Sequence, residues 1–274
     1  MSRPKKSLGQ NFLQDTNVAR KIVRALHLER DDCVLEIGPG KGALTSLLLD
    51  EVHAMRAVEL DKDLAHRLAE TYGKKLTIFV QDVLSVDLRS IAAVSGRKLR
   101  IVGNIPYNIT SPILFWIFDS CDVVSDSTLM MQREVAQRLV AKPRTKEYGI
   151  LSIFAQYYSA PKLLFTVSPE SFYPVPDVVS TVVSLDFSAQ REPRAKEEGV
   201  FRAIVRGTFG KRRKTLRNGL KSLEIPDKTL LLLSIDANRR PEELSVAEFV
   251  GLANEVTSRG VHPSFTNREG HHGR

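Results

Sequence analysis

A glycine-rich turn between a short apolar run and a helix pattern is the feature that most constrains the fold of this chain. The run Cys33–Ile37 is mostly apolar, the turn Gly-Pro-Gly-Lys-Gly extends from Gly38 to Gly42, and residues 43–49 are good helix formers. A strand, a glycine turn and a helix in this order begin a nucleotide-binding α/β unit. The glycine spacing differs from the dinucleotide-binding pattern. It lets a nucleoside with an amino-acid tail approach the backbone and does not require a pyrophosphate.

Acidic residues follow the next two predicted strands. The strand at 54–58 ends at Glu59, roughly 20 residues past the first glycine, where a carboxylate is placed to bind ribose hydroxyls. The run at 76–80 is followed by Gln81 and Asp82, and Asp82 can accept a hydrogen bond from an adenine amine. Ligands bind at the carboxyl edge of such sheets, so these strand ends predict one site. S-adenosylmethionine fits it, with its methionine tail over the glycines.

The segment Asn104-Ile105-Pro106-Tyr107 follows another apolar run and indicates chemistry on an aromatic amine. The exocyclic amine of adenine is a poor nucleophile because its lone pair is delocalised into the ring. The Asn104 side-chain oxygen and the backbone carbonyl of Ile105 or Pro106 can accept hydrogen bonds from that amine, which localises the lone pair. Pro106 stiffens the turn, and Tyr107 offers a face for stacking. An ordinary strand-to-loop turn is the alternative that these four residues alone leave open.

Five motifs occur in a fixed order along the chain, at residues 7–13, 36–42, 81–83, 104–107 and 172–176. In this order they resemble the ribosomal RNA adenine dimethyltransferases, and the resemblance extends from about Lys6 to Val256. Two branches of that family are considered, the small-subunit (16S-type) dimethyladenosine transferases and the macrolide-resistance enzymes that act on large-subunit RNA.

The C-terminal part of the chain favours the small-subunit branch. Residues 209–218 and 244–250 resemble that branch, whereas Lys41 and Ile105 are slightly closer to the resistance enzymes. In the motif that begins at Phe172, Asp177 and Val179 replace residues that are usually Lys and Asp in the family. No role is therefore assigned to these two positions.

The resemblance implies a Rossmann-like sheet, S-adenosylmethionine as cofactor and transfer of two methyl groups to the exocyclic amine of each target adenosine. It further implies two adjacent target adenosines in 16S ribosomal RNA, modified late in subunit assembly. The cofactor contacts carried over to this sequence are Gln10, Asn11, Leu13, Gly38, Gly40, Glu59, Asp82, Val83 and Asn104. Asn104, Pro106 and Tyr107 are expected to hold the target adenine, with Phe172 closing the stack from the opposite side. The alternative for Phe172 is a core aromatic residue.

The secondary-structure pattern changes near residues 188–193. Before this segment strand and helix patterns alternate, and after it no convincing strand is found. We therefore predict an α/β methyltransferase domain at 1–187 and a small all-helical domain at 188–274. Two helix starts are also predicted: Ser111 as the N-cap ahead of Pro112, and Ser245 with Glu248 as a capping box.

Positive charge is concentrated in the predicted helical domain. From residue 188 onward there are 17 Lys and Arg against 11 Asp and Glu, which gives +6 of the formal net charge of +8. The densest basic cluster is predicted to bind RNA and comprises Lys211, Arg212, Arg213, Lys214 and Arg217. A solvated helix face is the usual alternative for such a cluster. An enzyme that modifies a base must also hold the rest of the RNA, and this favours RNA binding as the role of the basic cluster.

Other classes of protein are disfavoured by the sequence. No apolar run approaches the ~20 residues of a membrane span, and no apolar signal core follows the basic N-terminus. Cys33 and Cys121 show neither disulfide nor metal spacing, and His262, His271 and His272 fall in a polar tail, so no metal is expected. We expect a cytoplasmic monomer whose partner is ribosomal RNA in the small subunit. A ribosome-assembly factor with secondary methylation remains an alternative.

Overall fold

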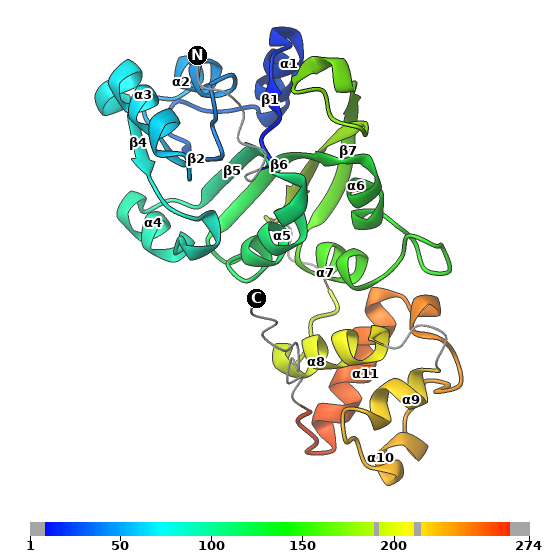
Figure 1. Ribbon diagram of the computed structural model, residues 1–274. Coiled ribbons are helices and arrows are strands. Elements are labelled where there is room, and N and C mark those ends of the chain that lie inside the picture. Colours follow the sequence, from blue (N-terminus) through cyan, green and yellow to red (C-terminus); the bar gives the residue numbers. More distant parts are fainter. Residues whose placement is uncertain (1–8, 189–191, 211–214, 264–274) are drawn as a thin grey trace, which may run out of the picture. The chain divides into compact units, whose positions relative to one another are not determined.

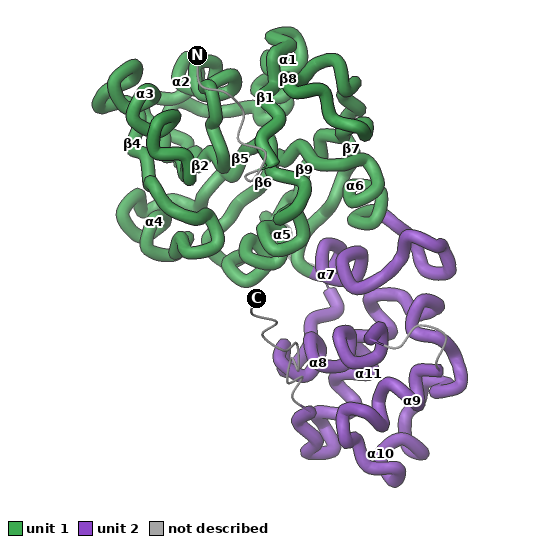
Figure 2. The backbone as a smooth tube through the Cα atoms, in the orientation of Figure 1, with its two compact units in different colours: residues 1–140, 158–190 green, residues 141–157, 191–274 purple. Residues whose placement is uncertain are grey.

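The computed structural model describes residues 9–188, 192–210 and 215–263 of the 274-residue chain (Figure 1). The chain forms two compact units: unit 1 contains residues 1–140 and 158–190, and unit 2 contains residues 141–157 and 191–274 (Figure 2). The boundary predicted at 187/188 lies close to the second crossing between the units. The earlier excursion of residues 141–157 into unit 2 was not predicted.

Unit 1 is built on a seven-stranded sheet with the order β4-β3-β2-β5-β6-β9-β7. Its strands are β2 (Cys33–Ile37), β3 (Met55–Val58), β4 (Leu76–Phe79), β5 (Leu99–Asn104), β6 (Val124–Gln132), β7 (Ala160–Val167) and β9 (Ser180–Asp186). Strands β2 to β6 pair in parallel, and β9 runs antiparallel to both β6 and β7. The expectation of a Rossmann-like α/β sheet is confirmed.

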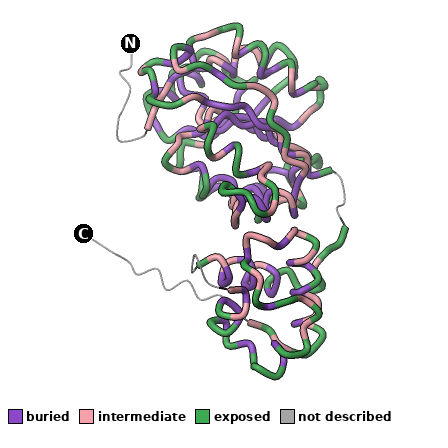
Figure 3. Tube along the Cα trace, turned by 90° about the vertical axis from the view of Figure 1, so that its right-hand side faces the viewer, coloured by how far each residue is buried: buried purple, intermediate pink, exposed green. Residues whose placement is uncertain are grey.

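Helices surround this sheet in unit 1. They are α1 (Thr16–Leu26), α2 (Thr45–Glu51), α3 (Lys62–Tyr72), α4 (Leu88–Ser95), α5 (Thr110–Phe118) and α6 (Arg133–Leu139), with the short 3-10 helices η2 (Gly73–Lys75), η3 (Val83–Ser85), η4 (Tyr107–Ile109) and η5 (Pro169–Ser171). Strand β2 is buried at all of its positions, because it is paired on both edges and covered on both faces. Figure 3 shows buried positions along the strands in the middle of unit 1.

A second, two-stranded sheet joins segments far apart in the sequence. Strand β1 (Phe12–Leu13) pairs antiparallel with β8 (Phe172–Tyr173), with Phe12 opposite Tyr173 and Leu13 opposite Phe172. The Gln14 N–H also donates to the Ser171 carbonyl at 2.8 Å. These bonds hold the N-terminal motif beside the motif that begins at Phe172.

The prediction that Ser111 caps a helix is wrong. Helix α5 already begins at Thr110, so Ser111 and Pro112 lie in its first turn, and the N-cap residue Ile109 makes no side-chain cap bond. The 3-10 helix η4 leads directly into α5 and supplies the preceding turn instead. Proline is tolerated at Pro112 because the N–H groups of the first turn have no partner within the helix.

Among its described residues, unit 2 contains helices and no strand. Its elements are most of α7 (Ile150–Tyr158), then α8 (Glu198–Phe209), α9 (Leu216–Lys221), α10 (Asp227–Leu231), η6 (Pro241–Glu243) and α11 (Val246–Ser258). The rings of Tyr157 on α7 and Phe201 on α8 have centroids 4.2 Å apart. This aromatic contact and the hydrogen bond from the Tyr148 hydroxyl to the Leu244 carbonyl, at 2.8 Å, join residues 141–157 to the rest of unit 2.

The predicted capping box at the start of α11 is confirmed. The Ser245 hydroxyl accepts a hydrogen bond from the Glu248 N–H at 3.2 Å, and the Glu248 carboxylate accepts one from the Ser245 N–H at 2.7 Å. Arg239 forms an ion pair with Glu248 at 2.5 Å, and this pairing lowers the pKa of Glu248 to about 2. In the part of the chain that the structure describes, no helix has the length and apolar character needed to cross a membrane.

Candidate active site

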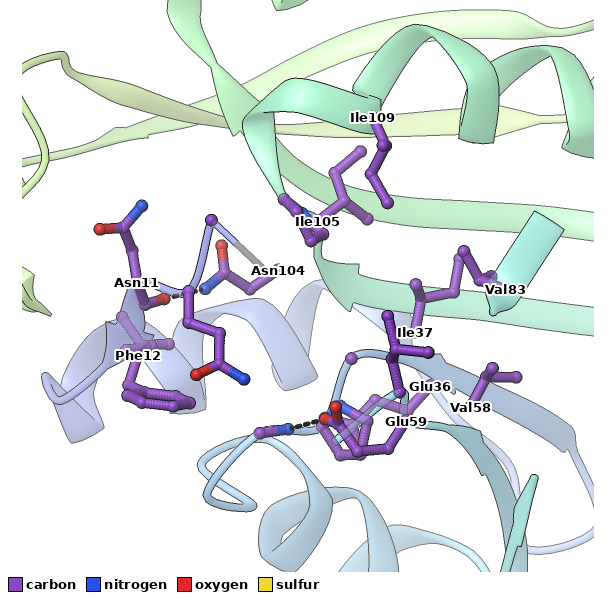
Figure 4. Close-up of a pocket in the computed structure, with 18 of the residues that line it drawn as sticks. Asn11, Phe12, Glu36, Ile37, Val58, Glu59, Val83, Asn104, Ile105 and Ile109 are labelled. Carbon is purple, nitrogen blue, oxygen red and sulfur yellow. Dashed lines mark hydrogen bonds between the residues drawn. The ribbon is translucent and has the colours of Figure 1, made fainter. Parts of the chain in front are cut away.

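The sheet of unit 1 opens at its carboxyl edge into a cavity of about 280 Å³ (Figure 4). The cavity is lined by the N-terminal segment around β1, the ends of β2 and β3, the segment after β4 and the segment after β5. All residues predicted to contact the cofactor line it: Gln10, Asn11, Leu13, Gly38, Gly40, Glu59, Asp82, Val83 and Asn104. Pro106 and Tyr107 line the same cavity, so the structure brings together residues from five separate segments.

The glycine turn exposes bare backbone to this cavity. Gly38 and Gly40 have positive φ angles of 62° and 58°, which non-glycine residues rarely adopt. A Cβ atom at Gly40 would lie 3.0 Å from Cδ1 of Phe12, so β1 packs tightly against the turn. A ligand at this position would therefore lie directly against main-chain atoms.

Glu59 ties the end of β3 to the glycine turn. One carboxylate oxygen accepts from the Gly40 N–H at 3.0 Å, and the other accepts from the Asp61 N–H at 2.9 Å. Burial raises the pKa of Glu59, while the hydrogen bonds from the Asp61 and Gly40 N–H groups oppose that rise. Each carboxylate oxygen has a further lone pair, so Glu59 can also accept from hydroxyl groups of a ligand.

Asp82 is an exposed residue that lines the same cavity. Its Oδ1 atom accepts from the Leu84 N–H at 2.9 Å and caps η3. This bond fixes the side chain and leaves Oδ2 able to accept from an amine. Glu59 and Asp82 are thus hydrogen-bond acceptors at two strand ends, as the sequence pattern predicts.

Asn104 is oriented by a contact with the N-terminal segment. Its Nδ2 atom donates to the Asn11 carbonyl at 2.8 Å (Figure 4). A carbonyl oxygen can only accept, so this bond determines which end of the amide is nitrogen and leaves Oδ1 available as an acceptor. The Ile105 N–H donates to the Met130 carbonyl at 3.1 Å, which anchors the following residue to β6.

Tyr107 is held at its phenol end. Its hydroxyl is hydrogen-bonded to the Ser180 hydroxyl at 2.7 Å, and burial raises the pKa of Tyr107. The ring is half-buried and lines the cavity, so it is fixed at the first residue of η4. An aromatic face is therefore presented next to Asn104 without a mobile side chain.

Phe172 does not line the cavity, which corrects the pocket role expected for it. Its side chain is 2% exposed and packs in the hydrophobic core with Leu13, Val167 and Val182. Side chains alternate along a strand, so in β8 Phe172 faces inward while Tyr173, 52% exposed, faces outward. The structure thus places Phe172 as a core aromatic, the alternative considered from the sequence.

Replacing Phe172 by leucine tests this placement. We expect the Phe172→Leu variant to lose about 1–2 kcal/mol of unfolding free energy, because a smaller apolar side chain remains in the core. Its kcat should stay within about threefold of the wild-type value, since the ring does not line the cavity. Thermal unfolding and steady-state kinetics measure the two quantities. A large loss of kcat with an unchanged melting temperature would show instead that Phe172 acts in the pocket for the target adenine.

Glu36 is a cavity-lining residue to which the sequence analysis assigned no separate role. It lies inside β2, is fully buried, and accepts a hydrogen bond from the Thr45 hydroxyl at 2.7 Å. Burial is the main cause that raises the pKa of Glu36 to about 8. An acidic residue within an otherwise apolar strand is the sequence signal that could have identified it.

Because the pKa of Glu36 is raised, the unfolding free energy of the protein should depend on pH. The pKa of Glu36 rises from the ordinary value of 4.5 to about 8 on folding, so the unfolded chain releases this proton first. Stability should fall as pH increases through this window and level off above it. In the Glu36→Gln variant this contribution is absent. The melting temperature of the variant minus that of the wild type should thus increase from pH 5 to pH 8. Parallel melting curves for both proteins across this range would contradict the assignment.

Of the predicted RNA-binding cluster, the structure describes only Arg217. Lys211, Arg212, Arg213 and Lys214 lie outside the described residues, and Arg217 is a partly exposed residue of α9. His271 and His272 also lie outside the described residues. Among the residues that are described, no group of three or more His, Cys, Asp or Glu could hold a metal ion.

Comparison with known proteins gives matches over nearly the whole chain. The family model described as ribosomal RNA adenine dimethylase matches residues 1–258. Ribosomal RNA small subunit methyltransferase A of Erwinia tasmaniensis is 44% identical over 257 residues, covering 93% of this chain and 93% of the relative. The protein of the same name from Alcanivorax borkumensis is 43% identical, covering 92% of this chain and 90% of the relative.

Solved structures share the fold at lower identity. A dimethyladenosine transferase from Plasmodium falciparum aligns with a TM-score of 0.74 and 23% identity, covering 92% of this chain and 99% of that chain. The 23S rRNA methyltransferase ErmE aligns with a TM-score of 0.66 and 23% identity, covering 90% of this chain and 100% of that chain. These two likenesses show that this chain shares its Rossmann-like fold with both structures.

Proposed function

The chain belongs to the ribosomal RNA adenine dimethylase family, and from this premise we propose that the cavity of unit 1 carries out its methyl transfer. The protein is an S-adenosylmethionine-dependent enzyme that converts adenosines of small-subunit ribosomal RNA to N6,N6-dimethyladenosine. The observation that carries the site assignment is the orientation of Asn104. Asn104 lines the same cavity as the glycine turn and Glu59, and its Nδ2 bond to Asn11 leaves Oδ1 available as an acceptor.

The residues of the cavity fit S-adenosylmethionine. Gly38 and Gly40 provide bare backbone for the amino-acid tail, Glu59 provides acceptors for ribose hydroxyls, and Asp82 provides an acceptor for the adenine amine. The remaining contacts are assigned to Gln10, Asn11, Leu13, Val83 and Asn104, which line the cavity. When bound, the cofactor supplies a methyl group on a positively charged sulfur, which leaves as a neutral thioether.

The target amine requires acceptors that the chain provides at the end of β5. Asn104 Oδ1 is one, because Nδ2 is already committed to Asn11. Of the two backbone carbonyls considered, that of Pro106 accepts from the Ile109 N–H at 3.3 Å and from the Thr110 hydroxyl at 3.2 Å. These bonds favour the Ile105 carbonyl as the second acceptor. Tyr107 stacks on the base, and orientation by these groups is the main catalytic contribution.

No strong general base is needed for this reaction. The pKa of the amine falls sharply once it is alkylated, so its proton leaves to water or to any nearby acceptor. Glu36 and Glu59, the buried acids of the cavity, are engaged by Thr45 and by backbone N–H groups. We assign them to structure and cofactor binding rather than to proton abstraction.

The choice of RNA rests on the relatives with higher identity. Those that are 42–44% identical are named for the small ribosomal subunit, whereas the two solved structures at 23% identity share only the fold. We further propose two adjacent target adenosines modified late in assembly, an RNA grip by Lys211–Lys214 and Arg217, and a cytoplasmic monomer. The net positive charge of +6 from residue 188 onward supports the RNA grip.

Transfer of labelled methyl groups to purified ribosomal subunits tests this proposal. Unmethylated small subunits should accept label, and large subunits assayed in parallel should not. Label on large-subunit RNA would show instead that the substrate is the RNA on which the resistance enzymes act. No label on either, with S-adenosylmethionine still bound, would favour a role in assembly without methylation.

A further inference from the structure

Lys41 in the glycine turn lies at the mouth of the cavity. Its side chain is exposed, and its Nζ atom is 4.7 Å from the ring centroid of Phe12 and 6.0 Å from that of Tyr173. Phe12 lines the cavity, whereas Tyr173 does not. The ammonium therefore lies near both the more buried ring of Phe12 and the more exposed ring of Tyr173. These two residues are opposite each other in the sheet formed by β1 and β8.

Within the part of the chain that the structure describes, the charge of Lys41 is not neutralised by an acidic residue. Among the residues that the structure describes, no carboxylate forms an ion pair with it. The faces of two aromatic rings attract a cation and restrict its position but leave its charge available. An ammonium that is held by two rings and has no ion-pair partner among the described residues is suited to bind an anion.

The neighbouring surface is suited to a nucleobase. Tyr173 is 52% exposed and Val175 is 60% exposed, in a segment stiffened by Pro174 and Pro176. Exposed aromatic rings next to a cation are the combination that binds single-stranded nucleic acid, because the ring stacks on a base while the cation contacts phosphate. An enzyme that extrudes a base from its stack must also hold the nucleotides that remain beside it.

We propose that Lys41 and Tyr173 form a nucleotide-binding lip for the RNA next to the extruded adenosine. Lys41 binds the backbone phosphate there, and Tyr173 stacks on the adjacent base. The inference rests on the proposed function and adds specific residues to it. The carboxylate of the bound cofactor is the other anion that an ammonium at this position can bind. Lys41 lines the cavity, but its ammonium also lies 6.0 Å from the ring centroid of Tyr173, which is not a lining residue, and this position favours the RNA phosphate.

Lys41→Gln tests the phosphate contact, and Lys21→Gln is its matched control. Lys21 on α1 also has its ammonium over an aromatic ring, 4.0 Å from the centroid of Phe165, but it does not line the cavity. The full chain is bound to unmethylated small ribosomal subunits at several salt concentrations. Lys41→Gln should weaken binding about three- to tenfold and reduce the slope of log K against log salt by about 0.7–0.9. Lys21→Gln should change neither quantity.

The stacking contact has its own pair of variants. Tyr173→Leu should raise KM for small subunits about five- to tenfold, because it removes the aromatic face. Tyr173→Phe keeps that face and should stay close to wild type. S-adenosylmethionine affinity, measured by calorimetry without RNA, should be unchanged in all four variants.

Two results would overturn the lip. In one, Lys41→Gln binds subunits with the wild-type affinity and salt slope, as Lys21→Gln does. In the other, Lys41→Gln loses S-adenosylmethionine affinity while subunit binding stays intact, which would assign the ammonium to the cofactor carboxylate. Failure of the proposed function is distinct from both, because it would be seen as absent methylation of small subunits by the wild-type protein.

Discussion

Replacing Asn104 by alanine is expected to lower kcat for methyl transfer about 10³-fold, the upper end of the usual cost of removing one preorganised hydrogen-bonding group from a reacting centre. The side-chain oxygen that localises the lone pair of the adenine amine is then missing. S-adenosylmethionine affinity should be largely kept, because the glycine turn, Glu59 and Asp82 are untouched. Single-turnover kinetics on small subunits and calorimetry of cofactor binding measure the two effects.

Asn104→Asp is the matched control for this variant. The carboxylate keeps an acceptor for the amine but cannot donate to the Asn11 carbonyl, 2.8 Å from Nδ2 in the wild type. We expect an intermediate rate, about 10- to 100-fold below wild type, because the acceptor is present but poorly oriented. Near-normal turnover in Asn104→Ala would contradict the role given to the side-chain oxygen.

Replacing Glu59 by alanine is expected to act on cofactor affinity first. The carboxylate accepts from the Gly40 N–H at 3.0 Å and from the Asp61 N–H at 2.9 Å, so its removal frees the glycine turn and leaves ribose hydroxyls without an acceptor. We expect the Kd for S-adenosylmethionine to rise about 100-fold, the equivalent of one or two lost charge-assisted hydrogen bonds. Calorimetry without RNA measures this directly.

Two controls distinguish the effect of removing the Glu59 carboxylate from the effect of removing a negative charge elsewhere in the protein. Glu59→Gln keeps one acceptor for the backbone N–H groups and should lose affinity to a smaller extent. Glu70→Ala removes an exposed acid on α3 that contacts only His66 in the described structure, and it should bind like wild type. Equal affinities for Glu59→Ala and Glu70→Ala would exclude Glu59 from the cofactor site.

The cofactor side of the cavity could be predicted from the sequence because each of its parts is local. The glycines, Glu59 and Asp82 each follow a strand recognisable by its apolar run. Parallel pairing of β2, β3 and β4 then places their carboxyl ends at one edge of the sheet. Neither step requires knowledge of contacts between distant segments.

The target side depends on contacts that no local pattern reveals. The inward direction of Phe172 and the outward direction of Tyr173 follow from the pairing of two-residue strands about 160 residues apart, a register set by tertiary packing. Likewise, residues 141–157 join unit 2 through contacts with distant segments, such as that of Tyr157 with Phe201. Helix α5 starts before Ser111 because η4 supplies the preceding turn, which overrides the local capping signal.

The central claim is that this cavity methylates the exocyclic amine of adenine, and the chemical identity of the product tests it most directly. Small-subunit RNA, reacted with S-adenosylmethionine and the wild-type enzyme, is digested to nucleosides and analysed by mass spectrometry. The account predicts N6,N6-dimethyladenosine with the wild-type enzyme and only traces of it with Asn104→Ala. Methyl groups found on ribose, on a ring nitrogen or on another base would contradict it.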